Sequence, residues 1–144
     1  MLIIDKIKNG IVIDHIKAGQ GVRVFDWLSL GKSPHTIAFV VNAPSLRMGR
    51  KDIIKIYDTI NIDHDILGLI DPNITVNIIE NEIVTKKITL QLPARVENIL
   101  FCKNPRCITS TEKYIPHIFH LADRAAETYR CEYCDETRGA EDFR

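Results

Sequence analysis

Four cysteines are the residues of this chain best suited to chemistry, and all lie in its last third: Cys102, Cys107, Cys131 and Cys134. They form a C-x4-C pair and a C-x2-C pair separated by a longer arm, a spacing typical of one tetrahedral zinc site. Four thiolates leave the metal no open position for a substrate. The spacing therefore predicts one structural zinc ion per chain, and a protein that works by binding rather than by catalysis.

The same residues allow alternatives to zinc. An iron–sulfur cluster is the main metal alternative, disulfides are the covalent one, and a redox-active C-x2-C pair would make the chain a small enzyme. His117 and His120 lie between the cysteine pairs, but four cysteines already complete a zinc shell, so we expect turn or surface histidines. We expect Lys103, Arg106 and Arg130 to offset the negative charge of a zinc ion bound by four thiolates.

The composition limits the classes of function. The chain has 144 residues, enough for one domain or two small ones, and its 19 basic and 19 acidic residues give zero net charge. That balance argues against a general nucleic-acid binder, which carries a basic excess. The apolar start at Met1–Ile4 is interrupted by Asp5, too early for a signal peptide, and no run approaches a membrane span. We therefore expect no membrane association and a reducing, cytoplasmic compartment.

Hydrophobic periodicity predicts the elements that position these residues. Strands are expected at Asn9–Ile16, His35–Asn42, Asp52–Asp58, Thr75–Ile79 and Ile83–Leu90. Helices are expected at Ala18–Leu30 and Asp63–Ile70. The order is β-α-β-β-α-β with an additional edge strand, which predicts a ferredoxin-like antiparallel sheet with both helices on one face. The other face is left for a ligand or partner.

Side-chain directions in the strands follow from their two-residue period. One face of the first strand is expected to hold Ile11, Ile13 and His15, and the other Val12 and Asp14. One face of the second strand is expected to hold Ile37, Phe39 and Val41. Residues 43–50 are expected to form a turn-rich connection, and residues 80–82 a tight turn.

The helices have predicted faces and ends. The first should present an apolar stripe that consists of Val22, Phe25, Trp27, Leu28 and Leu30. Gly31 stands where a glycine that ends the helix is expected. Asn61 or Asp63 is expected to cap the start of the second helix.

A boundary is predicted at Leu92–Arg95, where Pro93 breaks the preceding strand. Residues 1–92 would form the α+β domain described above. Residues 93–144 would form a small β-rich zinc-binding domain, since a segment of this size buries little core without a metal.

Several stretches, in order, carry a resemblance to a known family: GIVIDHI at Gly10–Ile16, MGRKDIIKI at Met48–Ile56, TVNII at Thr75–Ile79, and the cysteine quartet. Together they resemble the regulatory chain of aspartate carbamoyltransferase, over nearly the whole length. The resemblance implies a non-catalytic subunit in pyrimidine biosynthesis, with an N-terminal domain that binds nucleoside triphosphates and a zinc domain that grips the catalytic chain. It also implies a regulatory dimer that joins catalytic trimers, with ATP as the general activator, CTP as the inhibitor, and UTP acting with CTP.

The residues themselves fit a nucleotide site on the helix-free face. A triphosphate needs cationic donors and a ribose needs an acceptor for its hydroxyls, and alternation points Asp14 and Lys55 away from the helices. By resemblance, Asp14 takes the ribose hydroxyls, Lys55 the ribose or base, and His15 and Lys87 the phosphates. The nucleotide-binding set that the resemblance implies is Ile7, Asp14, His15, Lys51, Lys55, Asn77, Glu82, Val84 and Lys87. Among these, Lys51 lies near the phosphates, and Ile7, Glu82 and Val84 near the base.

Some matches to the family are imperfect. The lysine doublet at 86–87 makes Lys86 the alternative phosphate lysine, and Glu82 stands where the family has an aromatic residue. In the zinc domain, the resemblance makes Asn104, Arg106 and Glu112 candidates for contact with the catalytic chain, and a solvated turn is the alternative for each.

No nucleophile elbow, phosphate-binding glycine loop or carboxylate dyad is recognisable, so we expect no catalytic residues. The rival interpretation is a zinc-ribbon nucleic-acid-binding protein with a ligand-sensing N-terminal domain. For the regulatory interpretation, we expect the packing between the two domains, across Leu92–Phe101, to transmit the effect of nucleotide.

Overall fold

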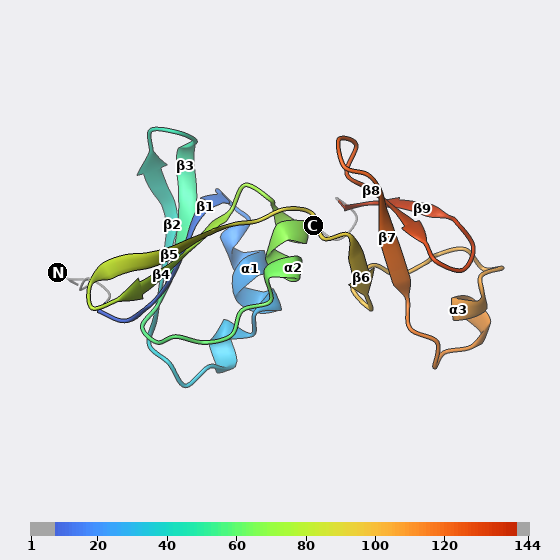
Figure 1. The fold of residues 1–144 in the computed structure, drawn as a ribbon, viewed down its shortest axis with the longest axis horizontal. Coiled ribbons are helices and arrows are strands. Elements are labelled where there is room, and N and C mark those ends of the chain that lie inside the picture. Colours follow the sequence, from blue (N-terminus) through green and yellow to red (C-terminus); the bar gives the residue numbers. More distant parts are fainter. Residues whose placement is uncertain (1–7, 141–144) are drawn as a thin grey trace.

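Residues 8–140 are described by the computed structural model, which contains two antiparallel β-sheets, one after the other along the chain (Figure 1). The first sheet has the strand order β2-β3-β1-β4-β5. Its strands are β1 (Gly10–Lys17), β2 (Ile37–Ser45), β3 (Gly49–Ile56), β4 (Thr75–Glu80) and β5 (Ile83–Thr89). The helices of this part are α1 (Gly21–Trp27), a 3-10 turn η1 (Leu30–Lys32) and α2 (His64–Ile70). The predicted α+β class is confirmed.

Both helices lie on one side of the first sheet, the side toward the second sheet (Figure 1). The register explains this arrangement, because one row of directly paired residues crosses all five strands: Phe39, Ile54, Ile13, Val76 and Ile88. Its three central members are at most 1% exposed. This row forms the apolar face that the helices cover, and the opposite face carries none of the helices.

Strand β1 departs from strict alternation at its end. The pairing with β3 shifts between Ile13 and Ile16, and His15 has a φ of 58°. This bulge moves His15 out of the buried face and gives its place to Ile16, which is 0% exposed. The prediction that His15 shares a face with Ile11 and Ile13 is therefore wrong.

Helix α1 is shorter than predicted. It begins at Gly21 rather than Ala18, after a turn in which Gly19 has a φ of +96°. It ends at Trp27, and the left-handed residue that follows is Ser29, with a φ of 54°, rather than the expected glycine at position 31.

The buried stripe of α1 also differs from the prediction. Val24 is 0% exposed, whereas Val22 is 53% and Trp27 is 41% exposed. Gly21 sets this rotation, because a Cβ there would lie 2.6 Å from the Phe39 ring. With position 21 against the sheet, helical spacing turns positions 24, 25 and 28 inward.

The hairpin of β2 and β3 is longer than predicted. Strand β2 continues to Ser45, which pairs with Gly49, so most of the expected turn region is strand. A register shift lies between Val40 and Ala43, where Asn42 has a φ of 58°. Val41, expected on the apolar face, is 51% exposed because this bulge breaks the alternation.

Two local predictions are confirmed. Asp63 caps α2, since its Oδ1 accepts hydrogen bonds from the backbone N–H groups of Asp65 and Ile66 at 3.0 and 3.1 Å. The turn between β4 and β5 is tight, with positive φ angles of 52° at Asn81 and 67° at Glu82, as in a two-residue hairpin turn.

The second sheet has the order β6-β7-β8-β9. Its strands are β6 (Arg95–Glu97), β7 (Ile118–Asp123), β8 (Thr128–Cys131) and β9 (Thr137–Gly139), with a short helix α3 (Ile108–Thr111) before β7. This agrees with the predicted small β-rich part.

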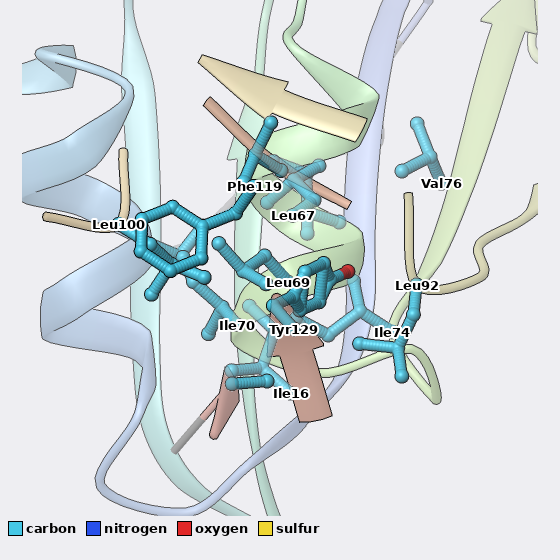
Figure 2. Close-up of a cluster of buried hydrophobic side chains, with 14 of the residues drawn as sticks. Ile16, Leu67, Leu69, Ile70, Ile74, Val76, Leu92, Leu100, Phe119 and Tyr129 are labelled. Carbon is cyan, nitrogen blue, oxygen red and sulfur yellow. The ribbon is translucent and has the colours of Figure 1, made fainter. Parts of the chain in front are cut away.

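The buried apolar side chains of both sheets form one cluster. Figure 2 shows Leu67, Leu69 and Ile70 of α2 beside Tyr129 and Phe119 of the second sheet. Tyr129 and Phe119 are 0% exposed, so α2 packs against both parts of the chain. Among the described residues, no helix is long and apolar enough to cross a membrane.

Candidate metal centre and ligand-binding face

The four cysteines meet at the far end of the second sheet. Cys102 follows β6, Cys107 immediately precedes α3, Cys131 ends β8, and Cys134 lies in the turn between β8 and β9. Their sulfur atoms all lie within 4.8 Å of one another, and Cys134 is the only one of the four that is not fully buried. The structure therefore clusters the four thiols for a metal ion.

The sulfur–sulfur distances fit a tetrahedral zinc or iron centre. Cys102 Sγ lies 3.6 Å from Cys134 Sγ, and Cys107 Sγ lies 3.8 Å from Cys131 Sγ. Zinc–sulfur bonds of about 2.3 Å place tetrahedral ligands about 3.8 Å apart. A disulfide would need about 2.05 Å, and all four cysteines are free thiols.

Burial and hydrogen bonds give the thiols different acidities. Burial raises the pKa of Cys102 to about 12, and it also raises the pKa of Cys131. Burial opposes ionisation of Cys107 too, but hydrogen bonds from the Thr109 hydroxyl and backbone, with further ones from the neighbouring thiols, lower its pKa to about 7. A cation at the centre favours the thiolate at all four positions.

Two neighbouring residues orient the ligands. The Thr109 hydroxyl donates to Cys107 Sγ at 3.1 Å, and Thr109 is 2% exposed. The backbone N–H of Cys102 donates to His117 Nδ1 at 3.0 Å, and burial together with the charge of Lys113 lowers the pKa of His117. His117 is therefore neutral and holds the backbone of Cys102 in place, and it is not itself a metal ligand. This agrees with the prediction that four cysteines complete the metal shell. Sequence reasoning missed Thr109, although its place two residues after a cysteine was the available signal.

The expected charge-masking residues are only partly available. Arg130 Nη1 lies 2.7 Å from Asp135 Oδ1, so that cation is already paired. Lys103 and Arg106 are exposed. His120 pairs with Glu132 at 2.9 Å on the surface.

The predicted partner-contact residues lie around α3. Asn104 Oδ1 accepts from the backbone N–H of Arg106 at 3.1 Å, and the Asn104 carbonyl accepts from Ser110 at 2.7 Å. Glu112 follows the helix and is exposed. Sequence reasoning missed the large apolar side chains exposed in this region, which are Phe101 (53%), Ile108 (46%) and Tyr114 (82%).

On the first sheet, the register brings several predicted nucleotide residues into one line. Lys55 pairs with Val12, Val12 with Asn77, and Asn77 with Lys87. Directly paired residues of neighbouring strands point to the same face. The adjacent row is the buried one, so Lys55, Asn77 and Lys87 share the helix-free face, which we call the ligand row. Lys86 instead pairs with Ile78 and belongs to the alternate face.

Asp14 and Lys51 meet on the same face. Lys51 Nζ lies 3.0 Å from Asp14 Oδ1 and 3.3 Å from Oδ2, and the two side chains are 17% and 20% exposed. Next to them, His15 Nδ1 lies 2.9 Å from Thr75 Oγ1. His15 also lines a hollow of about 220 Å³ together with the cations Lys17 and Arg47.

The residues predicted near the base lie at the opposite end of the sheet. Glu82 occupies the β4–β5 turn, and its backbone N–H donates to the Lys8 carbonyl at 2.9 Å. Val84 pairs with Ile79 and is 54% exposed. Ile7 lies outside the described residues. The predicted set therefore spans the length of the sheet, with Asp14 and Lys51 at one end.

Asp52 is a buried acid that sequence reasoning missed. It is 0% exposed, and its carboxylate accepts backbone N–H bonds from Gly19, Gly21 and Asn42, each at 3.0 Å. These bonds tie the start of α1 and the β2 bulge to β3. Alternation with the buried Ile54 was the signal that could have found it.

Comparisons with known proteins agree with this two-part arrangement. A family model described as "Aspartate carbamoyltransferase regulatory chain, allosteric domain" matches residues 2–91, and one described as "Aspartate carbamoyltransferase regulatory chain, metal binding domain" matches residues 94–144. Regulatory chains of that name from Clostridium botulinum (strain Hall) and Clostridium tetani are each 54% identical to this chain. The alignments cover 94% of this chain and 93% and 95% of those relatives. The chain of that name from Bifidobacterium longum is 39% identical, over 92% of this chain and 96% of its own length.

An antiparallel sheet with one face free of helices, followed by a four-cysteine domain, corresponds to the two domains that these comparisons describe for a regulatory chain. The chain belongs to the family of aspartate carbamoyltransferase regulatory chains, with an allosteric domain and a metal-binding domain. The resemblance predicted from the sequence, and the prediction of a non-catalytic subunit, are confirmed.

Proposed function

We propose that residues 1–92 of this chain bind ATP, CTP and UTP. Residues 93–144 bind a structural zinc ion and contact the catalytic chain of aspartate carbamoyltransferase. The observation that carries the proposal is the ligand row, beside the Asp14–Lys51 pair. It gathers cationic donors, an amide and a carboxylate on the one face of the sheet that no helix covers.

The chemistry of that face suits a nucleoside triphosphate. Lys87, Lys51 and His15 supply donors for phosphate oxygens, and Asp14 accepts from ribose hydroxyls. Lys55 and Asn77 lie between them and contact ribose or base. The pairing of Lys87 with Asn77, and of Lys86 with Ile78, favours Lys87 as the phosphate lysine.

The base end of the proposed site is formed by Val84 and Glu82, with Ile7 as the remaining member. From Asp14 to Gly10, the rise of four residues along β1 is about 13 Å, which is enough to accommodate an extended nucleotide. A carboxylate at position 82 accepts hydrogen bonds from exocyclic amino groups, so it favours adenine and cytosine over uracil at this end.

Zinc is the proposed metal because four thiolates at tetrahedral spacing are a closed structural site. Its ligands are Cys102, Cys107, Cys131 and Cys134. When bound, zinc supplies cross-linking of the loops and keeps the thiols deprotonated. The chain's own residues, Thr109 and His117, hold two of the ligands in place.

The loop and helix around α3 form the proposed contact with the catalytic chain, through Asn104, Arg106 and Glu112. A second copy of this chain would complete a regulatory dimer. We propose no nucleic-acid partner, since the net charge is zero, and a cytoplasmic location, where thiols stay reduced.

Calorimetric titration of ATP and CTP into the zinc-loaded chain tests the nucleotide proposal. Lys87→Ala should weaken binding about tenfold, the effect of losing one hydrogen bond to a charged group. Lys86→Ala is the matched control, because it removes the same charge from the alternate face and should change the Kd by less than about twofold. Absence of nucleotide binding, or equal losses in both variants, would contradict the proposal.

A further inference from the structure

The backbone carbonyls of residues 92–94, in the segment that connects the two sheets, accept hydrogen bonds from the second sheet and its turn. Arg124 Nη1 donates to the Leu92 carbonyl at 3.1 Å. The Tyr129 hydroxyl donates to the Pro93 carbonyl at 2.7 Å, and the Leu121 backbone N–H donates to the Ala94 carbonyl at 2.8 Å. Three consecutive carbonyls are therefore held by β7, β8 and the turn between them.

Burial protects the hydrogen bond of Tyr129. Leu92 is 3% exposed and Tyr129 is 0% exposed, so water does not replace the Tyr129 hydrogen bond at Pro93. Arg95, the residue after the segment, pairs with His120 as the first residue of β6. Residues 92–94 are therefore tied by hydrogen bonds to the second sheet, so along the backbone the boundary between the two parts lies before them.

The residue just before this fastened segment meets α2. A Cβ added to Gly68 would lie 2.2 Å from the carbonyl oxygen of Gln91. Glycine inside a helix costs about 0.5–1 kcal/mol relative to alanine, so its presence in α2 is explained by this close approach of helix to backbone. Leu67 and Leu69, on either side of Gly68, are both 0% exposed and lie beside Tyr129 (Figure 2).

Gln91 is also close in sequence to the ligand row. Lys87 stands on β5, which ends at Thr89, so a displacement of β5 reaches Gln91 within four residues. The ligand row itself faces away from the second sheet, whereas α2 lies on the side toward it (Figure 1). Gln91 thus lies where three parts of the chain meet: strand β5, helix α2, and residues 92–94.

We propose that the Gly68–Gln91 contact is the joint that couples nucleotide binding to the metal-binding domain. Gly68 and Tyr129 are the positioning residues of this joint. Gly68 allows α2 to pack directly against the Gln91 backbone, and Tyr129 holds residues 92–94 through its bond to Pro93. The inference rests on the proposed function, and it places the transmitting joint at Gln91 rather than along residues 92–101.

The test uses the chain assembled with the catalytic chain of its enzyme. The measured quantity is the coupling ratio, defined as the half-saturating aspartate concentration without nucleotide divided by that with saturating ATP or CTP. It is determined for the parent chain, Gly68→Ala and Tyr129→Phe. The control variants are Gly31→Ala, where an added Cβ comes no closer than 3.3 Å to a neighbour, and Val22→Ala, whose side chain on α1 is 53% exposed.

Nucleotide Kd and bound metal are measured on each free chain in parallel. We expect Gly68→Ala and Tyr129→Phe to keep the parent Kd and metal content while the coupling ratio moves at least about threefold toward one, from a typical 5–150-fold. The controls should keep the parent ratio. Gly68→Ala displaces backbone and can prevent folding. In that case the coupling ratio of Tyr129→Phe tests the proposal.

The inference is overturned if Tyr129→Phe binds nucleotide normally and retains the parent ratio, or if its only change is a weaker nucleotide Kd in the free chain. A parent chain that binds no nucleotide would instead refute the proposed function, and the inference with it. The two failures are distinguishable because the first is seen in the variants and the second in the parent.

Discussion

Replacement of Thr109 by valine should weaken metal binding without unfolding the chain. The Thr109 hydroxyl donates to Cys107 Sγ at 3.1 Å, and Thr109 is 2% exposed. Valine has nearly the same shape, so the change removes the donor and leaves the packing of α3 in place. The thiolate of Cys107 then loses its only side-chain hydroxyl donor among the described residues.

The size of the effect follows from the type of bond. A hydrogen bond to a charged group contributes about 1.5–3 kcal/mol, and burial of Thr109 means that water does not take over the lost contact. That range corresponds to a decrease of about 10–150-fold in metal affinity. Residues that support metal ligands elsewhere typically change affinity by about 10–100-fold, so we expect a decrease of at least about tenfold.

Competition against a chromophoric zinc chelator measures the affinity directly. Thr111→Val is the matched control, because the Thr111 hydroxyl in the same helix donates to the Ile108 carbonyl at 3.2 Å and is exposed. This control should stay within about twofold of the parent. An unchanged affinity in Thr109→Val, with the fold preserved by circular dichroism, would refute the assignment of Thr109 as a support for the metal ligand.

Two further results are expected. Asp52→Asn should lower the free energy of unfolding of the metal-loaded chain by about 3 kcal/mol, because an amide cannot accept all the buried N–H groups that Asp52 now satisfies; a loss below about 1 kcal/mol in urea titration would show that these bonds contribute little. Zinc removal by a chelator should release the chain from the catalytic chain in sedimentation, because the loops around α3 lose their cross-link. Nucleotide should still bind to the released chain, and an assembly that stays intact without metal would contradict the proposed role of the zinc domain.

Sequence reasoning recovered what depends on regular periods and spacing. The cysteine pairs specified the metal cluster because close pairs leave few ways to arrange four sulfurs. The strands and their order followed from alternation, and the Asp63 cap from its residue type. These features are local, or depend on one repeated pattern.

The errors occur where a tertiary contact overrides the local pattern. His15 and Val41 were placed on the wrong faces because bulges, each with a positive φ next to or at the position, shift the alternation. The predicted buried stripe of α1 is wrong because Gly21, which has no side chain, lies directly against the sheet. The spacing of apolar residues does not reveal such a contact. Asp52 was overlooked because its hydrogen-bond partners are distant in sequence.

The placement of the two sites limits how strongly they can affect one another. The ligand row faces away from the second sheet, so a nucleotide there acts on the metal-binding domain through the helix layer and the buried side chains that pack between the two parts. A nucleotide shifts the assembly by its difference in affinity between the two quaternary states and by no more. Typical coupling is about 1–3 kcal/mol, whereas one buried hydrogen bond contributes about 0.5–1.5 kcal/mol. Because these quantities are comparable, removal of the Tyr129 hydroxyl, which holds the segment after the proposed joint, is expected to produce a measurable change in the coupling ratio.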